Sequence, residues 1–272
     1  MLLCTALIFN SCKKDEATPA ATTPETAPDL PPSSSFIMNT DSFPQATKKM
    51  AKNDSSNVAF AALNVGVWNV IIALNMVVPT VAFLESFNHP AVNTAKGEWK
   101  WTYTFNAANA IHSAELKANL VGDSVKWQMH ISKQNDFTNV LWYSGSSALN
   151  GTAGNWTLNK DPHNVTPFVF IEWHKNSNGT SDIKYTNIIP KDAGNGGYIK
   201  YGITNVTPYD AFYTIYGIQQ NNLVDIKWSR SNRSGRVQNP AYFKDSLWHC
   251  WNTNLANARI RYATKRNWLK SV

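Results

Sequence analysis

Two neighbouring side chains in the sequence have the types that acid–base chemistry needs. Glu172 and His174 lie in the segment FIEWHK, and residues two apart in a β-strand point to the same face of the sheet. A carboxylate beside an imidazole can take a proton from one group and give it to another. A hydrogen-bonded polar pair at the end of a strand produces the same pattern, and we favour that interpretation.

A glycoside hydrolase would need two carboxylates that face each other across a cleft. Five acidic residues lie in strand-like segments, and their spacing does not pair them: Glu98, Glu115, Glu172, Asp225 and Asp245. The sequence contains no H-x-H, H-E-x-x-H or C-x-x-C motif, no glycine-rich phosphate loop and no G-x-S-x-G elbow. We therefore expect no metal site and no cofactor, and catalysis is the less favoured class of function.

Aromatic side chains are the other candidates for binding, because exposed rings can stack on sugars. Most of the 11 tryptophans fall on the apolar face of alternating segments, where packing in the core is the expected role. Trp142 with Tyr143, and Trp248 with Trp251, cannot all point the same way. We therefore take these four residues as the candidates for an exposed patch that binds a ligand.

Cysteine content and charge exclude several classes of protein. With only Cys4, Cys12 and Cys250, the chain is not a disulfide-stapled fold, and the aromatic neighbours of Cys250 indicate a buried, inert thiol. The formal net charge is +7, but much of the excess lies in a C-terminal tail, residues 257–272, that contains no acidic residue. We interpret this tail as a solvated end and expect no nucleic-acid partner.

The first twelve residues, MLLCTALIFNSC, carry an apolar core and no charge. The run is too short to span a bilayer and is typical of a signal peptide, residues 1–11, that ends at Cys12. Phe9-Asn10-Ser11-Cys12 resembles the lipobox of bacterial lipoproteins, although Phe9 stands where a Leu is usual and Asn10 where a small residue is usual. The resemblance implies that Cys12 is acylated and becomes the first mature residue.

Four charges follow the cysteine directly. They resemble the export signal of surface lipoproteins of the Bacteroidetes, a basic residue followed by acidic ones, and they are Lys13, Lys14, Asp15 and Glu16. The chain as a whole resembles uncharacterised Bacteroidetes lipoproteins with Trp-rich strands. This resemblance implies a protein anchored in outer-membrane lipid through the acylated cysteine, and the charges favour exposure at the cell surface; the resemblance implies no activity.

The segment after the anchor has the composition of a spacer. Residues 12–35 are rich in Pro, Thr, Ala and Ser and contain hardly any large apolar side chain, so we predict a disordered linker there. A polar lead-in, residues 36–57, follows it. Ser55, Ser56 and Asn57 at its end are suitable N-caps for a helix.

A long apolar helix is predicted over residues 58–88, because residues 58–84 contain no charged side chain. Its length also fits a membrane span. A lipid-exposed helix is disfavoured by the proline Pro79 and by three amides, Asn64, Asn69 and Asn75. The export signal disfavours it as well. We favour a helix buried nearly all round in its own domain.

The remainder, residues 94–256, alternates between apolar and polar side chains. EWKWTYTF places Trp99, Trp101, Tyr103 and Phe105 on one face, and Asn-Gly pairs between later segments indicate hairpin turns. The pattern predicts a mainly β fold: an antiparallel meander of about eleven strands, curled as a half-barrel or barrel around the one buried apolar helix. The order of elements is similar to the half-barrel of bacterial lipoprotein carriers.

From these features we expect a lipid-anchored cell-envelope protein with a non-catalytic binding or structural role. Its partners would be outer-membrane lipid and either a glycan or a hydrophobic ligand. Two alternatives remain: a carrier of lipids or other hydrophobic ligands, which requires a real cavity behind the helix, and an envelope glycan hydrolase, which requires paired carboxylates.

Overall fold

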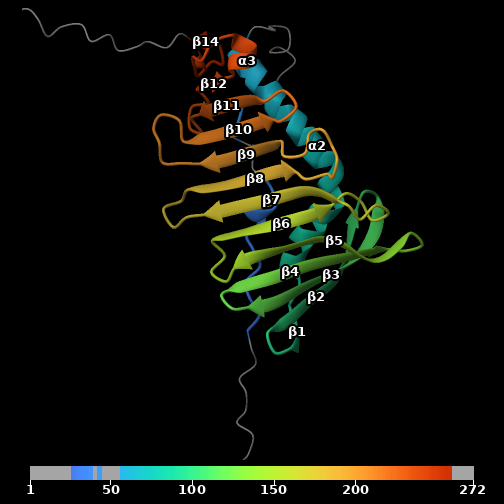
Figure 1. Cartoon of the computed structure of the whole chain (residues 1–272). Helices are drawn as coiled ribbons and strands as arrows, with labels where there is room; N and C mark the ends of the chain where they lie inside the picture. Colours follow the sequence, from blue (N-terminus) through green and yellow to red (C-terminus); the bar gives the residue numbers. More distant parts are fainter. Residues whose placement is uncertain (1–25, 39–41, 45–55, 259–272) are drawn as a thin grey trace, which may run out of the picture.

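The computed structural model describes residues 26–38, 42–44 and 56–258. Its main feature is one antiparallel sheet in which fourteen strands lie side by side in chain order, from β1 at one edge to β14 at the other. The sheet does not close on itself (Figure 1). The prediction of a mainly β meander with a half-barrel shape is therefore confirmed, with three strands more than expected.

The elements run through the chain as follows. They are η1 (Ser33–Ser35), α2 (Asn57–Glu85), η2 (Ser86–Asn88), β1 (Val92–Ala95), β2 (Glu98–Ala107), β3 (Ala110–Val121), β4 (Ser124–Lys133), β5 (Phe137–Ala148), β6 (Ala153–Asn159), β7 (Pro167–Lys175), β8 (Ser181–Asn187), β9 (Tyr198–Ile203), β10 (Ala211–Gly217), β11 (Asn222–Trp228), β12 (Gly235–Gln238), α3 (Pro240–Phe243), β13 (His249–Trp251) and β14 (Asn257–Ala258).

The two faces of the sheet differ sharply in chemistry. In β2, Trp99, Trp101 and Tyr103 are buried, whereas the residues between them are exposed or half-buried. The same alternation continues through most strands. We call the aromatic face the inner face and the polar one the outer face, because α2 lies on the aromatic side.

Helix α2 crosses the inner face and is fastened at both ends. At its start the Oγ atom of Ser56 accepts a hydrogen bond from the backbone N–H of Ala59, so the predicted N-cap is confirmed. The Asn57 side chain then donates to the carbonyl of Cys250, which immediately precedes the last residue of β13. Near the other end, the hydroxyl of Tyr103 on β2 donates to the carbonyl of Ala82.

The middle of α2 is not buried, and here the prediction was wrong. No residue between 66 and 75 is buried, and Leu74 is 77% exposed. A long twisted sheet curves away from a straight helix, so the two touch mainly near the helix ends. The outward side of α2 is an apolar stripe: Leu63, Val67, Val70, Ile71, Leu74 and Val77. By length and composition alone, residues 57–88 could also cross a membrane.

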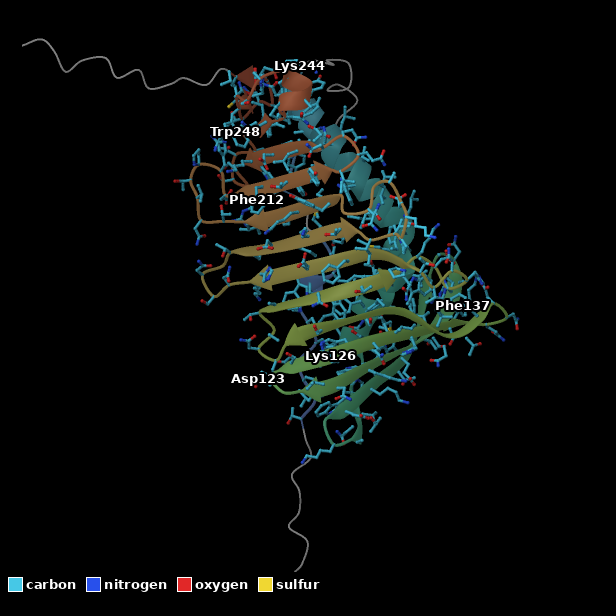
Figure 2. The ribbon with its side chains drawn as sticks, viewed as in Figure 1. Asp123, Lys126, Phe137, Phe212, Lys244 and Trp248 are labelled. Atoms are coloured by element: carbon cyan, nitrogen blue, oxygen red, sulfur yellow. The ribbon has the colours of Figure 1, made fainter. Side chains whose placement is uncertain are left out.

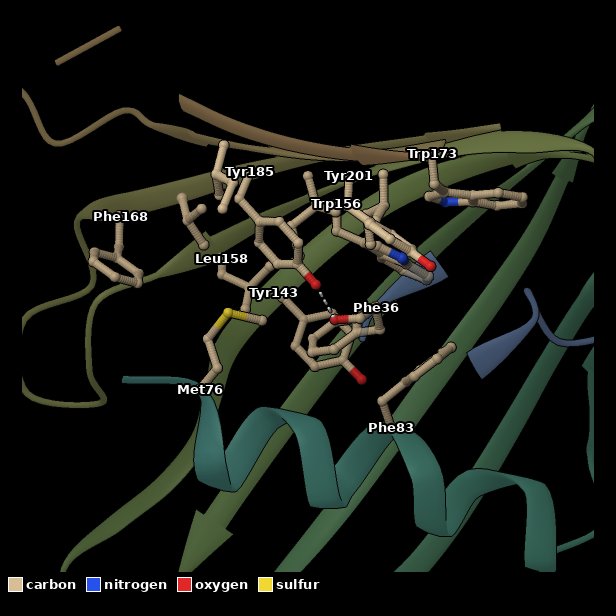
Figure 3. Close-up of a cluster of buried hydrophobic side chains, with 14 of the residues drawn as sticks. Phe36, Met76, Phe83, Tyr143, Trp156, Leu158, Phe168, Trp173, Tyr185 and Tyr201 are labelled. Carbon is tan, nitrogen blue, oxygen red and sulfur yellow. Dashed lines mark hydrogen bonds between the residues drawn. The ribbon is translucent and has the colours of Figure 1, made fainter. Parts of the chain in front are cut away.

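A segment before the helix fills the space that the helix leaves. Residues 26–38, which we call the strap, run along the inner face between α2 and the sheet (Figure 1). Phe36 lies near its C-terminal end, stacked on Phe83 of α2 and in contact with Tyr143 and Trp156 of the sheet (Figure 3). Residues 26–35 of the predicted linker therefore belong to the folded domain, since Ser35 is fully buried and bonded to Trp156; residues 12–25 lie outside the described part of the chain.

The C-terminal end of the sheet also differs from the prediction. The sequence pattern YFKDSLWHCW predicts one strand over residues 242–251, but Pro240–Phe243 forms the short helix α3. The side chain of Asn239 caps this helix by accepting from the backbone N–H of Tyr242, and proline at the first helical position supports it. The strand there is confined to His249–Trp251.

Candidate functional site

A crevice of about 470 Å³ lies beside the exposed middle of α2. Val67, Ile71 and Ile72 of the helix form one wall, and Phe168 of β7 contributes to the floor. The opposite wall consists of the loop that follows β8 and the turn that follows β10, with Ile189, Ile218 and their neighbours. We call this hollow the helix crevice; its size falls within the range of small-molecule sites, roughly 300–1,000 Å³.

The loop wall of the crevice is held in place by hydrogen bonds of its own. The Asn187 side chain accepts from the backbone N–H of Ile189 and donates to Asp192 at 3.0 Å. Asp192 in turn accepts from the N–H of Gly194, and Asn195 donates to the Ile189 carbonyl. Such side-chain-to-backbone bonds fold a loop locally. The wall is therefore formed without a ligand.

The lining defines what the crevice can bind. None of its lining residues is charged; the polar side chains among them are Asn187, Tyr216, Gln219 and Gln220. Apolar surface gains free energy when a ligand removes it from water, at roughly 25 cal/mol per Å². The arrangement suits an apolar ligand with one uncharged polar group, and it offers no residue for acid–base catalysis.

A second hollow of about 410 Å³ opens on the strap side of α2. Ile37 and Met38 of the strap and Met76 of the helix line it, together with Tyr185 of β8. Ile72 lines both hollows. The apolar linings of the two hollows therefore meet at this residue of α2.

The aromatic candidates from the sequence separate into two groups. Trp142, Tyr143 and Trp251 are all buried, so the predicted exposed patch is wrong for these three. The ladder between β4 and β5 is irregular at Trp142: Met129 pairs with Tyr143, but His130 pairs with Leu141. This β-bulge is the reason that two successive side chains are both buried. Only Trp248 is partly exposed.

The predicted acid–base residues do not bind each other. Glu172 forms an ion pair with Lys184 across the β7–β8 ladder at 3.3 Å, and His174 does so with Asp182 at 3.3 Å. Both pairs lie on the outer face, where cross-strand pairs of this kind support a sheet. Neither the acid–base pair nor the hydrogen-bonded pair expected from the sequence is therefore found among the described contacts.

The other carboxylates considered in the sequence also have local partners, and Asp245 lies before β13 rather than in a strand. Glu115 bonds Lys100 and Lys117; burial alone would raise its pKa, but these two lysines outweigh burial and lower it. Asp225 accepts from Thr214, and Asp245 pairs with His249. A polar hollow of about 480 Å³ on the outer face is lined by lysines and amides and contains none of these acids.

The remaining predicted sites give little chemistry. Cys250 is half-buried, and burial raises the pKa of its thiol more than the charge of Arg236 lowers it. No group of three metal-ligating side chains occurs among the described residues. Cys12 and the four charges from Lys13 to Glu16 lie outside the described part of the chain.

Comparison of the chain with protein-family models, curated proteins and solved structures finds no match. The function is therefore argued from the residues and their geometry. The helix crevice was not predicted from the sequence, because an uncharged helix gives no sign of which side faces solvent. The only signal was the apolar run itself, residues 58–84.

Proposed function

We propose that this protein is a lipid-anchored cell-envelope protein that binds an apolar ligand in the helix crevice without catalysing a reaction. The observation that carries the proposal is α2, which has no charged residue from Val58 to Leu84 and whose middle stands clear of the sheet beside an apolar hollow. A contiguous exposed apolar surface of this kind marks a site of interaction with a ligand, a partner or a membrane.

The packing favours an open binding site over an enclosed carrier. The space beneath the C-terminal half of α2 is filled by Phe36, Phe83, Tyr143 and Trp156, which lie within 6.0 Å of one another, ring centre to ring centre, in the recorded pairs (Figure 3). A ligand would therefore lie alongside the helix, with part of its surface still reachable from outside.

Binding can be tested with the full chain carrying Cys12→Ala, which removes the acylated residue and permits work without detergent. N-phenyl-1-naphthylamine, which is uncharged, serves as the fluorescent probe and 1-hexadecanol as the competitor. Ile218→Asp places a charge in the crevice and should abolish competition by 1-hexadecanol. Leu74→Asp, on the outward side of the same helix, should leave competition unchanged. If the competitor displaces the probe equally well from both variants, the helix crevice is not the binding site.

The anchor is supported by the signal-peptide pattern, by the resemblance of residues 9–12 to a lipobox, and by the charges from Lys13 to Glu16. Cys12→Ala should release the protein from the membrane fraction of the cell, and protease added to intact cells should cleave the wild-type chain. If the variant stays in the membrane fraction, the anchor is wrong and α2 becomes the membrane-binding element.

A further inference from the structure

A cluster of aromatic and cationic side chains lies on the outer face at the C-terminal end of the sheet. Its centre is Arg236 of β12, whose guanidinium carbon lies 4.3 Å from the ring centre of Trp248 and 5.0 Å from that of Tyr209. The Lys227 ammonium lies 5.5 Å from the Trp248 ring. We call these four residues the cationic platform. Lys227 and Arg236 alternate with buried residues of β11 and β12, so they lie on the outer face, and Figure 2 labels Trp248 at this end of the sheet.

The β-ladder brings the two cations together. Lys227 pairs directly with Arg236 between β11 and β12, and like charges in directly opposed positions destabilise a sheet. The rings of Trp248 and Tyr209 compensate in part, since a cation over an aromatic face is stabilised by the ring quadrupole. Two positive charges held side by side favour an anion.

Neighbouring acids form no ion pair with the platform. Among the described residues, the ion pairs include neither Lys227 nor Arg236. Asp210 is bound to Arg230 at 2.9 Å, and Asp245 to His249 at 3.0 Å. The Nε atom of Arg236 is buried and has no hydrogen-bond partner in the described part of the chain.

Arg236 is also ordered before any ligand arrives. Two rings flank its guanidinium, so the side chain has already lost much of the rotamer freedom that binding would otherwise remove. A guanidinium forms paired hydrogen bonds with a carboxylate or a sulfate more strongly than neutral donors do. The partly exposed rings beside it supply a surface on which the C–H face of a sugar can stack.

We infer that the cationic platform is a second binding site, separate from the helix crevice, and that it binds an acidic glycan. The acid group of the sugar lies against Arg236 and Lys227, and a neighbouring sugar ring lies against Trp248. A lipid headgroup fits less well, because its bilayer would also lie against outer-face ion pairs such as Lys200–Asp182. Removing such pairs from water is costly.

The test uses the full chain with Cys12→Ala and measures binding to polygalacturonate by affinity electrophoresis, with dextran as the neutral comparison. The wild-type platform should bind polygalacturonate and not dextran. Arg236→Gln should weaken binding about tenfold or more, as expected for the loss of a charge-assisted hydrogen-bond pair. The Arg236→Lys variant should bind polygalacturonate more tightly than Arg236→Gln but more weakly than the wild type, because the ammonium cannot bond in the same paired geometry.

Lys126→Gln is the matched control, because it removes the same charge from the outer face at the other end of the sheet. It should change binding less than twofold. Equal weakening by Lys126→Gln and Arg236→Gln would overturn the proposal in favour of general charge attraction. Binding to vesicles of phosphatidylglycerol that depends on Arg236, without binding to polygalacturonate, would overturn it in favour of a lipid headgroup. Absence of binding to both would also overturn it.

Discussion

The indole of Trp156 lies so close to Gly145 that no side chain fits between them. A Cβ atom on Gly145 would lie 2.6 Å from Cε3 of Trp156 and 2.1 Å from the carbonyl oxygen of Asn155. Gly145 pairs with Trp127 on one side and Trp156 on the other, so a glycine separates two large rings along the inner face. The same relation recurs where Gly235 lies between Trp228 and Trp251.

Gly145→Ala should destabilise the fold by about 1–3 kcal/mol, the usual cost of overpacking, because the nearest obstructing atom belongs to the backbone. Gly66→Ala provides the comparison, since a Cβ atom at this position of α2 meets nothing within 4 Å. It should stabilise the chain by about 0.5–1 kcal/mol through helix propensity. Urea unfolding of both variants measures the difference, and changes of the same sign would contradict the argument.

Phe36 should contribute to stability as a core residue although it lies outside the sheet and the long helix. It is 1% exposed, and its carbonyl accepts a hydrogen bond from the Tyr185 hydroxyl at 2.9 Å. Phe36→Ala should lower the free energy of unfolding by about 3–5 kcal/mol. Ile111→Ala, at a side chain that is 68% exposed, should cost less than about 0.5 kcal/mol. If Phe36→Ala lowers the free energy of unfolding no more than Ile111→Ala does, the strap is not part of the folded core.

The strap shows where sequence reasoning reached its limit. Residues 26–35 have the Pro- and Ser-rich composition of a linker, and composition does not reveal that Phe36 anchors them in a distant aromatic cluster. Alternation of side chains, in contrast, predicted most of the strands, because a sheet with one buried face imposes a period of two. The short strands β1, β12 and β14 were missed, since two to four residues cannot display that period.

The candidate site was harder to predict than the fold for a physical reason. Burial of α2 depends on how the sheet curves beneath it, which is a property of all fourteen strands together. Likewise, the partial exposure of Trp248 depends on Arg236 and Tyr209, which are 12 and 39 positions away in the chain. The spacing of residues along one strand therefore predicts neither the burial of α2 nor the exposure of Trp248.

Asn57 should hold the start of α2 against the sheet. Its side chain donates to the Cys250 carbonyl at 2.8 Å, and its backbone N–H donates to Asn257 at 2.8 Å. Asn57→Ala should speed amide hydrogen exchange in the first turns of α2 and cost about 0.5–1.5 kcal/mol. Asn64→Ala is the control, because the Asn64 side chain bonds only the Phe60 carbonyl of its own helix in the described contacts. Similar exchange in both variants would rule out this role for Asn57.

Stability should fall on mild acidification because of two histidines on β3 and β4. Burial lowers the pKa of His112, with Lys133 adding to the effect and the Ala110 carbonyl and Asp136 opposing it. Burial also lowers the pKa of His130. In the unfolded chain both histidines have the ordinary pKa of 6.5. The unfolded chain therefore binds more protons than the folded chain as the pH drops through that value.

The free energy of unfolding should accordingly be level near pH 8 and decrease between about pH 7 and pH 5.5, before the carboxylates titrate. His112→Phe keeps a ring stacked on Phe105 but cannot be protonated, so its decrease over this range should be smaller than that of the wild type. His174→Gln, at an exposed side chain, is the comparison and should retain most of the wild-type slope. Urea unfolding at several pH values supplies the measurement. A decrease in His112→Phe as steep as that of the wild type would show that the buried ring does not govern the response to acid.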